Sequence, residues 1–136
     1  MTWKPAFREI EIRGLNPETA GKKKIERKNI LKKAIREHLG KNLQKIQNRC
    51  KNKPLYIDVC FYLYYSDELG STKKDLDNLM KILLDVLSVN MINGQKPIEG
   101  LGIVRDDSDI RKITCKKEIV NSFEGAGIDL QISVGH

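Results

Sequence analysis

The segment from Leu55 to Tyr64 constrains the fold of this chain more than any other feature. Its five odd-numbered positions are aliphatic or aromatic, and they alternate with three tyrosines, one aspartate and one cysteine. A period of two is typical of a β-strand, in which successive side chains point to opposite faces. The second face is too apolar for ordinary solvent-facing surface, so we expect it to lie under a helix or against another subunit.

Two stretches have the periodicity of helices. From about Lys24 to Cys50, apolar residues recur at steps of three and four. This spacing predicts an amphipathic helix, with Gly40 as a point of interruption. A second helix is expected to begin near Asp75 to Asp77, because a stripe of leucine and methionine starts there and continues to Leu87.

Three shorter segments complete the predicted fold. Phe7 to Arg13 alternates as a short strand, Ile113 to Ile119 indicates another, and Ile128 to Val134 alternates without a break. The resulting order, β-α-β-α-β-β, predicts an α/β (α+β) protein. We expect a single domain over residues 1–136, in which a mixed β-sheet packs with two main helices.

The bulk composition limits the class of protein. A chain of 136 residues is long enough for one domain with a buried core. No apolar stretch approaches the roughly 20 residues that span a bilayer, and Met1 to Pro5 is not followed by the apolar centre of a signal peptide. We therefore expect a cytoplasmic protein. Three widely spaced cysteines and two histidines argue against a disulfide framework, a zinc site or a histidine-based nuclease.

Positive charge is concentrated between Gly21 and Lys53. This stretch holds thirteen basic and two acidic residues, a net charge of +11, whereas the whole chain carries +7 and the remainder therefore −4. A basic segment beside an acidic centre is expected when one part contacts phosphates and another holds a metal ion. The alternative is a lysine-rich, solvated helix of the kind found in thermophilic proteins.

Two groups of carboxylates stand in the acidic part. Asp75 and Asp77 flank the start of the second helix, Lys81 follows Asp77 by one turn, and Asp106 and Asp107 stand at a loop–strand boundary. Clustered carboxylates repel one another and need a cation to remain ionised, and their oxygens are ligands that Mg²⁺ prefers. The pattern therefore predicts a Mg²⁺ site, and a basic protein that holds this ion is a candidate for phosphodiester hydrolysis.

Each acidic residue also has an ordinary structural explanation. Asp75 is a suitable helix N-cap, and Asp77 in a first turn favours the helix dipole. Asp77 and Lys81 would form a surface pair worth about 0.3 kcal/mol. The adjacent aspartates at 106 and 107 are typical of a turn. The metal site thus depends on the joint pattern and not on any single residue.

The joint pattern resembles that of RusA-type Holliday junction resolvases. In that family, a D-x-D-N-x-x-K helix start is followed by an aspartate and a leucine, and then by a hydrophobic-x-D-D-x-x-I segment. The match covers about Lys74 to Ile113, and Asn93 to Gly102 resembles an insertion. The matching segments are Asp75-Leu76-Asp77-Asn78-Leu79 with Lys81, Asp85-Val86-Leu87, and Ile103-Val104-Arg105-Asp106-Asp107-Ser108-Asp109-Ile110.

The resemblance implies a homodimeric endonuclease that binds four-way DNA junctions and makes paired nicks in DNA recombination and repair. It implies Mg²⁺ as the cofactor, with Mn²⁺ as an alternative ion and no small-molecule cofactor. By motif position, Asp75, Asp77 and Asp107 are metal-binding and catalytic, Asp106 is a supporting ligand and Lys81 is the catalytic lysine. We expect DNA contacts from Lys22, Lys23, Lys24, Arg27, Lys28, Lys73, Lys74 and Arg105.

Two other functions are compatible with the sequence. A non-catalytic module that binds branched DNA would rely on the basic stretch, and Asp75, Asp77 and Asp107 would then be structural. A nuclease for flaps, replication forks or RNA would have the same acidic centre. In the resolvase interpretation the protein is associated with the nucleoid, and the segment from Leu55 to Tyr64 is a candidate for part of the dimer interface.

Overall fold

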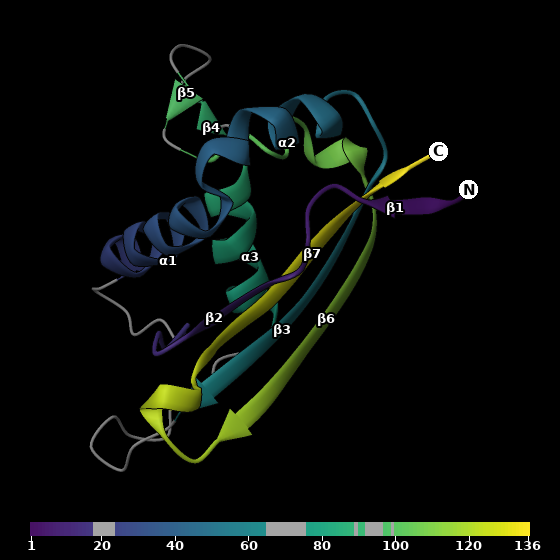
Figure 1. Ribbon diagram of the computed structural model, residues 1–136. Helices are drawn as coiled ribbons and strands as arrows, with labels where there is room; N and C mark the ends of the chain where they lie inside the picture. Colours follow the sequence, from purple (N-terminus) through teal and green to yellow (C-terminus); the bar gives the residue numbers. More distant parts are fainter. Residues whose placement is uncertain (18–23, 65–75, 89, 92–96, 99) are drawn as a thin grey trace.

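Strand β3 (Leu55–Tyr64) lies in the middle of the sheet that organises the molecule (Figure 1). The computed structural model describes residues 1–17, 24–64, 76–88, 90–91, 97–98 and 100–136. Within these residues, β3 pairs antiparallel with β7 (Gly127–Gly135) along one edge and parallel with β6 (Ile110–Val120) along the other. The strand expected from the alternating sequence is thus confirmed over its whole length.

The long helix expected from Lys24 to Cys50 is interrupted at Gly40. Helix α1 (Lys24–Leu39) is followed by a short 3₁₀ helix (Gly40–Asn42) and by α2 (Leu43–Cys50). Gly40 has a φ of +53°, in the left-handed region that glycine adopts without steric cost. The third helix, α3 (Leu76–Leu87), begins where the apolar stripe predicted it.

Short strands extend the sheet on its β7 side. Strands β1 (Trp3–Pro5) and β2 (Ile10–Arg13) both pair antiparallel with β7. The strand expected from Phe7 begins three residues later, and β1 was not predicted because three residues that include a proline show no alternation. Strands β4 (Asn90–Met91) and β5 (Pro97–Ile98) form a separate two-stranded ribbon.

The helices lie on one face of the sheet (Figure 1). The odd-numbered side chains of β3, from Leu55 to Leu63, point toward them and are at most 1% exposed. They share one core with Ile35 of α1, Ile46 of α2 and Leu83 of α3. The even-numbered side chains of β3 are half-buried on the other face, which no helix of the described residues covers. The mixed α+β class is confirmed.

Strand β3, helix α3 and strand β6 form a β-α-β crossover that sets the direction of α3. Parallel strands need a connection that returns the chain to the starting end of the sheet. Helix α3 makes this return (Figure 1). The carbonyls of Val86 and Leu87 accept hydrogen bonds from the N–H groups of Leu101 and Ile103, at 2.8 and 2.9 Å. The segment that leads into β6 is therefore attached to the C-terminal end of α3.

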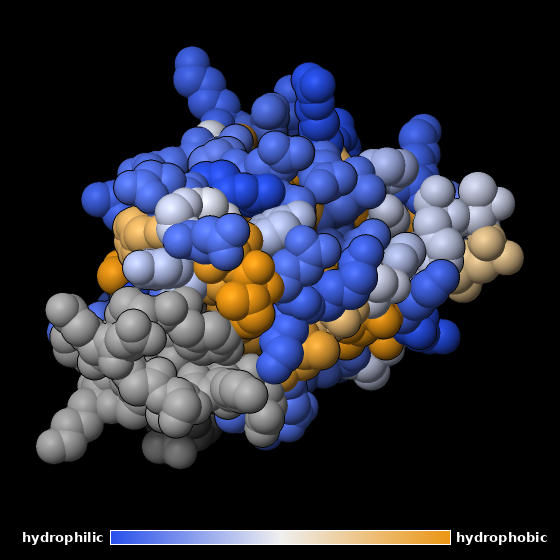
Figure 2. Space-filling model, turned by 90° about the horizontal axis from the view of Figure 1, so that it is seen from below, coloured by the Kyte–Doolittle hydropathy of each residue, from blue (hydrophilic) through white to orange (hydrophobic). Residues whose placement is uncertain are grey.

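The side of the molecule drawn in Figure 2 is mainly hydrophilic where it is described. Figure 2 shows the side seen from below, where hydrophobic residues reach the surface in places among polar ones. Such scattered exposure is normal in a folded protein. Among the described helices, none is both long and apolar enough to cross a membrane.

Gly127 provides a test of the sheet register. A Cβ at this position would lie 1.7 Å from the carbonyl oxygen of Ile12 in β2, whereas a Cβ at Gly125 would meet its nearest atom at 3.5 Å. Backbone cannot yield as a flexible side chain can, so we expect Gly127→Ala to lower the free energy of unfolding by about 3 kcal/mol or more. Urea unfolding should show this loss, with Gly125→Ala as the matched control. Equal midpoints for the two variants would contradict the close approach of β2 and β7.

Candidate functional site

Asp77 and Lys81 lie together on the first two turns of α3. Their side chains are 80% and 66% exposed, and Lys81 Nζ lies 3.5 Å from Asp77 Oδ2. An exposed pair at this spacing contributes about 0.3 kcal/mol to a helix. Its greater effect is on direction, because the lysine is held on the same face of the helix as the carboxylate. The pairing predicted from their spacing is present.

Asp106 and Asp107 stand immediately before β6. Asp106 caps a short 3₁₀ helix (Asp107–Asp109), and its carboxylate accepts a hydrogen bond of 2.9 Å from the backbone N–H of Ser108. This bond lowers the pKa of Asp106, because it stabilises the charged carboxylate. Asp106 thus has a structural task as an N-cap, while Asp107 is exposed in the first position of the 3₁₀ helix.

The structure does not bring Asp77 and Asp107 together within one chain. The ten-residue step from Asp77 to Leu87 along α3 corresponds to about 15 Å. The segment that leads on to Asp107 is hydrogen-bonded to Leu87, at the far end of the helix, with Ile103 N–H and Val104 N–H both donating to the Leu87 carbonyl. The crossover explains this separation, because a connecting helix starts at the opposite end of the sheet from the next parallel strand (Figure 1).

Several of the expected site residues lie outside the described part of the chain. These are the metal ligand Asp75 and four of the expected DNA contacts. For Lys24, the structure describes only the backbone, as the first residue of α1. The expectations for these residues therefore stay predictions. The four DNA contacts in question are Lys22, Lys23, Lys73 and Lys74.

Two of the basic residues expected to contact DNA have partners within the protein. Lys28 Nζ lies 2.5 Å from Asp85 Oδ2 and joins α1 to α3. Arg27 donates from Nη1 to the carbonyl of Asn16 at 3.3 Å. Both contacts give these residues a structural role in addition to the expected contact with DNA. The lysine also presents less positive charge to DNA, because it is paired with a carboxylate. Arg105 is exposed next to Asp106.

Two grooves lie on either side of Arg49 in α2, and the sequence analysis did not single them out as binding surfaces. The groove between α2 and the segment around β2 has a volume of about 410 Å³, and the groove between α2 and β1 about 530 Å³. Arg49 donates from Nη1 to the Ala6 carbonyl at 2.7 Å, which holds its guanidinium between them. The basic residues that line the two grooves are Lys4, Arg8, Lys45, Arg49 and Lys53. Glu9 and Glu11 also line the 410 Å³ groove, whereas no acidic residue among those described lines the other.

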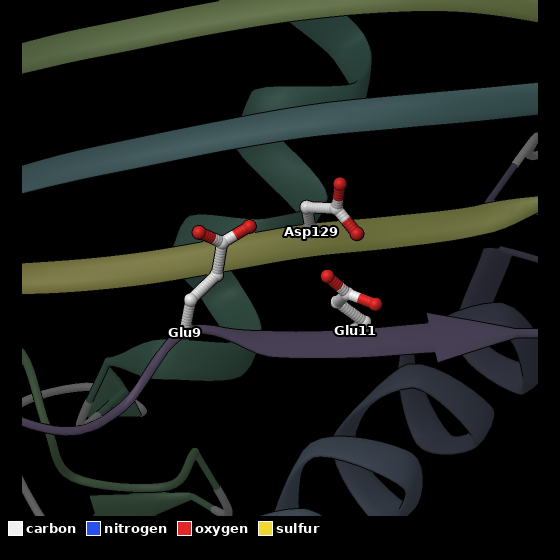
Figure 3. A group of neighbouring side chains, drawn as sticks. All are labelled: Glu9, Glu11 and Asp129. Carbon is white, nitrogen blue, oxygen red and sulfur yellow. The ribbon is translucent and has the colours of Figure 1, made fainter.

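A further group of carboxylates lies on the face of the sheet away from the helices (Figure 3). Glu9 and Glu11, from the segment that includes β2, approach Asp129 of β7, and the carboxylate oxygens lie within 4.8 Å of one another. Glu11 and Asp129 are direct register partners. Three carboxylates at this spacing could hold a metal ion. Sequence inspection missed them because their proximity depends on the pairing of strands that are more than a hundred residues apart.

Asp129 already has other partners in this group. Arg13 Nη2 lies 2.8 Å from Asp129 Oδ1, as an ion pair without hydrogen-bond geometry, and the Tyr62 hydroxyl donates to Oδ2 at 2.8 Å. The Arg13 guanidinium also lies 4.3 Å from the centroid of the Tyr62 ring. An arginine that neutralises the carboxylate reduces its need for a metal ion. This makes the triad a weaker metal site than its spacing alone indicates.

Comparison with known proteins adds no assignment. No protein-family model, no curated protein and no solved structure matches this chain.

The Tyr62–Asp129 contact can be tested by titration. The hydrogen bond to Asp129 and the negative charge of that carboxylate raise the pKa of Tyr62, because both disfavour the phenolate. We expect Asp129→Asn to lower the pKa of Tyr62 toward about 10, the ordinary value for tyrosine. Tyrosinate absorbance measures this, and Tyr62→Phe identifies which of the four tyrosines titrates. If Mg²⁺ alone lowers the Tyr62 pKa in the unsubstituted protein, the triad binds the ion in place of Arg13.

Proposed function

We propose that this protein is a Mg²⁺-dependent endonuclease of the RusA type that acts on branched DNA, with four-way junctions as its substrate. The observation that carries the proposal is the acidic motif, whose described members Asp77, Asp106 and Asp107 all lie exposed on the surface. Exposure leaves carboxylate oxygens accessible to a divalent cation and to the phosphates of DNA. In this proposal the protein works in the cytoplasm, in association with the nucleoid.

The separation of Asp77 and Asp107 in one chain implies that their shared site is assembled from two chains. In a dimer with two-fold symmetry, each residue of one copy that contacts the other copy does so reciprocally. Asp77 of one copy can then meet Asp107 of the other, and the symmetry produces the site twice. Two such sites suit paired nicks in two strands of one junction. The homodimer is thus part of the proposal.

Asp75, Asp77 and Asp107 are the residues that would hold the ion, with Asp106 beside them. Their oxygens match the donors that Mg²⁺ and Mn²⁺ accept. When bound, the ion supplies an activated water and stabilises the leaving oxygen of the phosphodiester. Lys81, held beside Asp77 at 3.5 Å, would contribute positive charge toward the phosphate in the transition state.

DNA contacts beyond the metal site would come from the basic surface around α1 and α2. Arg27 and Lys28 are partly occupied by internal contacts, so we propose that the groove between α2 and β1, which Lys4, Arg49 and Lys53 line, adds to the phosphate contacts. Residues of this kind bind the backbone of DNA without reading its sequence. Their loss should weaken binding and reduce its dependence on salt concentration.

A second candidate function is a non-catalytic module that binds branched DNA. The observation in its favour is the ordinary structural role found for two of the acids, since Asp106 caps a 3₁₀ helix and Asp77 pairs with Lys81. The two functions differ in their dependence on metal. A module binds four-way junctions in EDTA and cleaves none of them in Mg²⁺ or Mn²⁺.

Asp77→Asn tests the catalytic assignment. We expect cleavage of a labelled four-way junction in Mg²⁺ to fall roughly a hundredfold or more, because even a second-shell partner of a metal ligand is typically worth about 10- to 100-fold. Junction binding should stay equal or become tighter, since a negative charge near phosphate is removed. Asp109→Asn is the matched control, because Asp109 lies in the 3₁₀ helix beside Asp107 but is not a proposed ligand. Full cleavage by Asp77→Asn would exclude Asp77 from the catalytic centre.

Mixing two inactive variants tests whether the site spans two chains. In a mixed dimer of Asp77→Asn and Asp107→Asn, one shared site carries both substitutions and the other carries neither. Random exchange of subunits should then restore single nicks at about a quarter of the sites, although each variant alone is inactive. Sites built within single chains would give no restoration, because each chain would carry one of the two substitutions.

A further inference from the structure

Strand β6 presents the longest unpaired strand edge in the described part of the chain. It spans Ile110–Val120 and pairs with β3 on one side only. Strands β1 and β2, on the opposite side of the sheet, are much shorter. An open edge carries a row of N–H and C=O groups that can bond to another strand. The length of β6 makes it the edge most suited to such pairing.

Two isoleucines on β6 are exposed beside this edge. Ile113 is 43% exposed and Ile119 is 59% exposed. Their register partners in β3 are Ile57 and Leu63, both fully buried on the helix-covered face. Both isoleucines therefore belong to the same face of the sheet, at the margin of the core. Covering a large aliphatic side chain that is about half exposed lowers the free energy, because its apolar surface is removed from water.

We propose that β6 pairs antiparallel with β6 of a second copy of this chain, about a two-fold axis at Lys116. Ile113 and Ile119 are six residues apart on one face. In an antiparallel register centred on Lys116, each Ile113 lies opposite Ile119 of the second copy, so all four isoleucines are covered. In a register centred on Ile113 or on Ile119, that isoleucine faces the same residue of the second copy. The other isoleucine then faces a residue outside β6. The proposed register overlaps the strands from Lys112 to Val120.

The other face of β6 carries Lys112, Lys116 and Glu118. Thr114 lies opposite Glu118 of the second copy. The two Lys116 side chains meet at the axis, which is unfavourable for like charges. Each has Glu118 of its own and of the second copy two positions away, within reach of a long side chain. Lysines on an edge strand discourage unspecific pairing. Registers slipped by two residues would place a lysine directly opposite Glu118, but they would no longer place Ile113 opposite Ile119, so the isoleucines and not the charges select the register.

The pairing also has a consequence for the proposed two-chain site, and in this respect the inference depends on the proposed function. Antiparallel pairing places the start of β6 in one copy beside the end of β6 in the other. Asp106 and Asp107, which precede β6, are thereby carried toward the end of the joined sheet at which α3 of the second copy begins. Asp77 lies in the first turn of that helix. The open edge and the exposed isoleucines do not depend on the function.

Analytical ultracentrifugation of three variants tests the surface and its register. Ile113→Glu and Ile119→Lys should each weaken the dimer about tenfold or more in dissociation constant, because each places a charge opposite an isoleucine on both sides of the axis. The double variant Ile113→Glu/Ile119→Lys should recover much of the affinity, since opposite charges then face each other. Ile30→Glu is the matched control, because Ile30 is 50% exposed on α1, away from β6. Circular dichroism verifies that every variant is folded.

Three results would overturn the inference. They are a monomeric unsubstituted protein, single variants that dimerise as well as it does, and a double variant no better than the single ones. The dimer is measured without DNA or metal, so the outcome is separable from that of the nuclease. A β6 dimer that cleaves no junction would refute only the nuclease. A nuclease whose dimer tolerates all three variants would refute only the β6 surface.

Discussion

Parallel pairing between β3 and β6 is the constraint on which the rest of the structure depends. Two parallel neighbours cannot be joined by a tight turn, so the chain has to cross back over the sheet. Helix α3 makes this crossing and covers the sheet with the apolar side that carries Leu79, Leu83 and Leu87. The same crossing places the first turn of α3 and the start of β6 at opposite ends of the sheet. The distance between Asp77 and Asp107 is therefore a consequence of the topology.

The two groups of acids differ in how strongly they need a cation. Asp129 has the positive charge of Arg13 at 2.8 Å and a hydrogen bond from Tyr62, so its repulsion with Glu9 and Glu11 is already reduced. Asp107 is exposed at the start of a 3₁₀ helix. Asp77 pairs with Lys81, whose positive charge is weakened by solvent because both side chains are exposed. A carboxylate with an internal counter-charge gains less from a metal ion than one without. Asp77 and Asp107 are therefore stronger candidates for binding a metal ion than the group of Glu9, Glu11 and Asp129, in a dimer that brings them together.

Local patterns predicted the elements of this fold better than their arrangement. The alternation from Leu55 to Tyr64 identified β3, and the apolar periodicity together with Gly40 identified α1, the break and α2. Local alternation and periodicity do not show which strands pair. Neither the parallel register of β3 with β6 nor the Glu11–Asp129 contact was therefore predicted. For the site, spacing predicted the Asp77–Lys81 pair, because both lie on one helix. It could not show that Asp77 and Asp107 are separated, because that depends on the direction of α3.

The open edge of β6 and the separation of the acids have one origin. A crossover ending in an edge strand leaves that strand with a free side and leaves its starting end far from the first turn of the helix. Antiparallel pairing of two such edges reverses the direction of one copy against the other. The start of each β6 then lies at the end of the sheet where the other copy's α3 begins. A dimer formed through α1 and α2 would leave this edge open. The two features together thus favour the β6 edge as the place where a site shared by two chains would form.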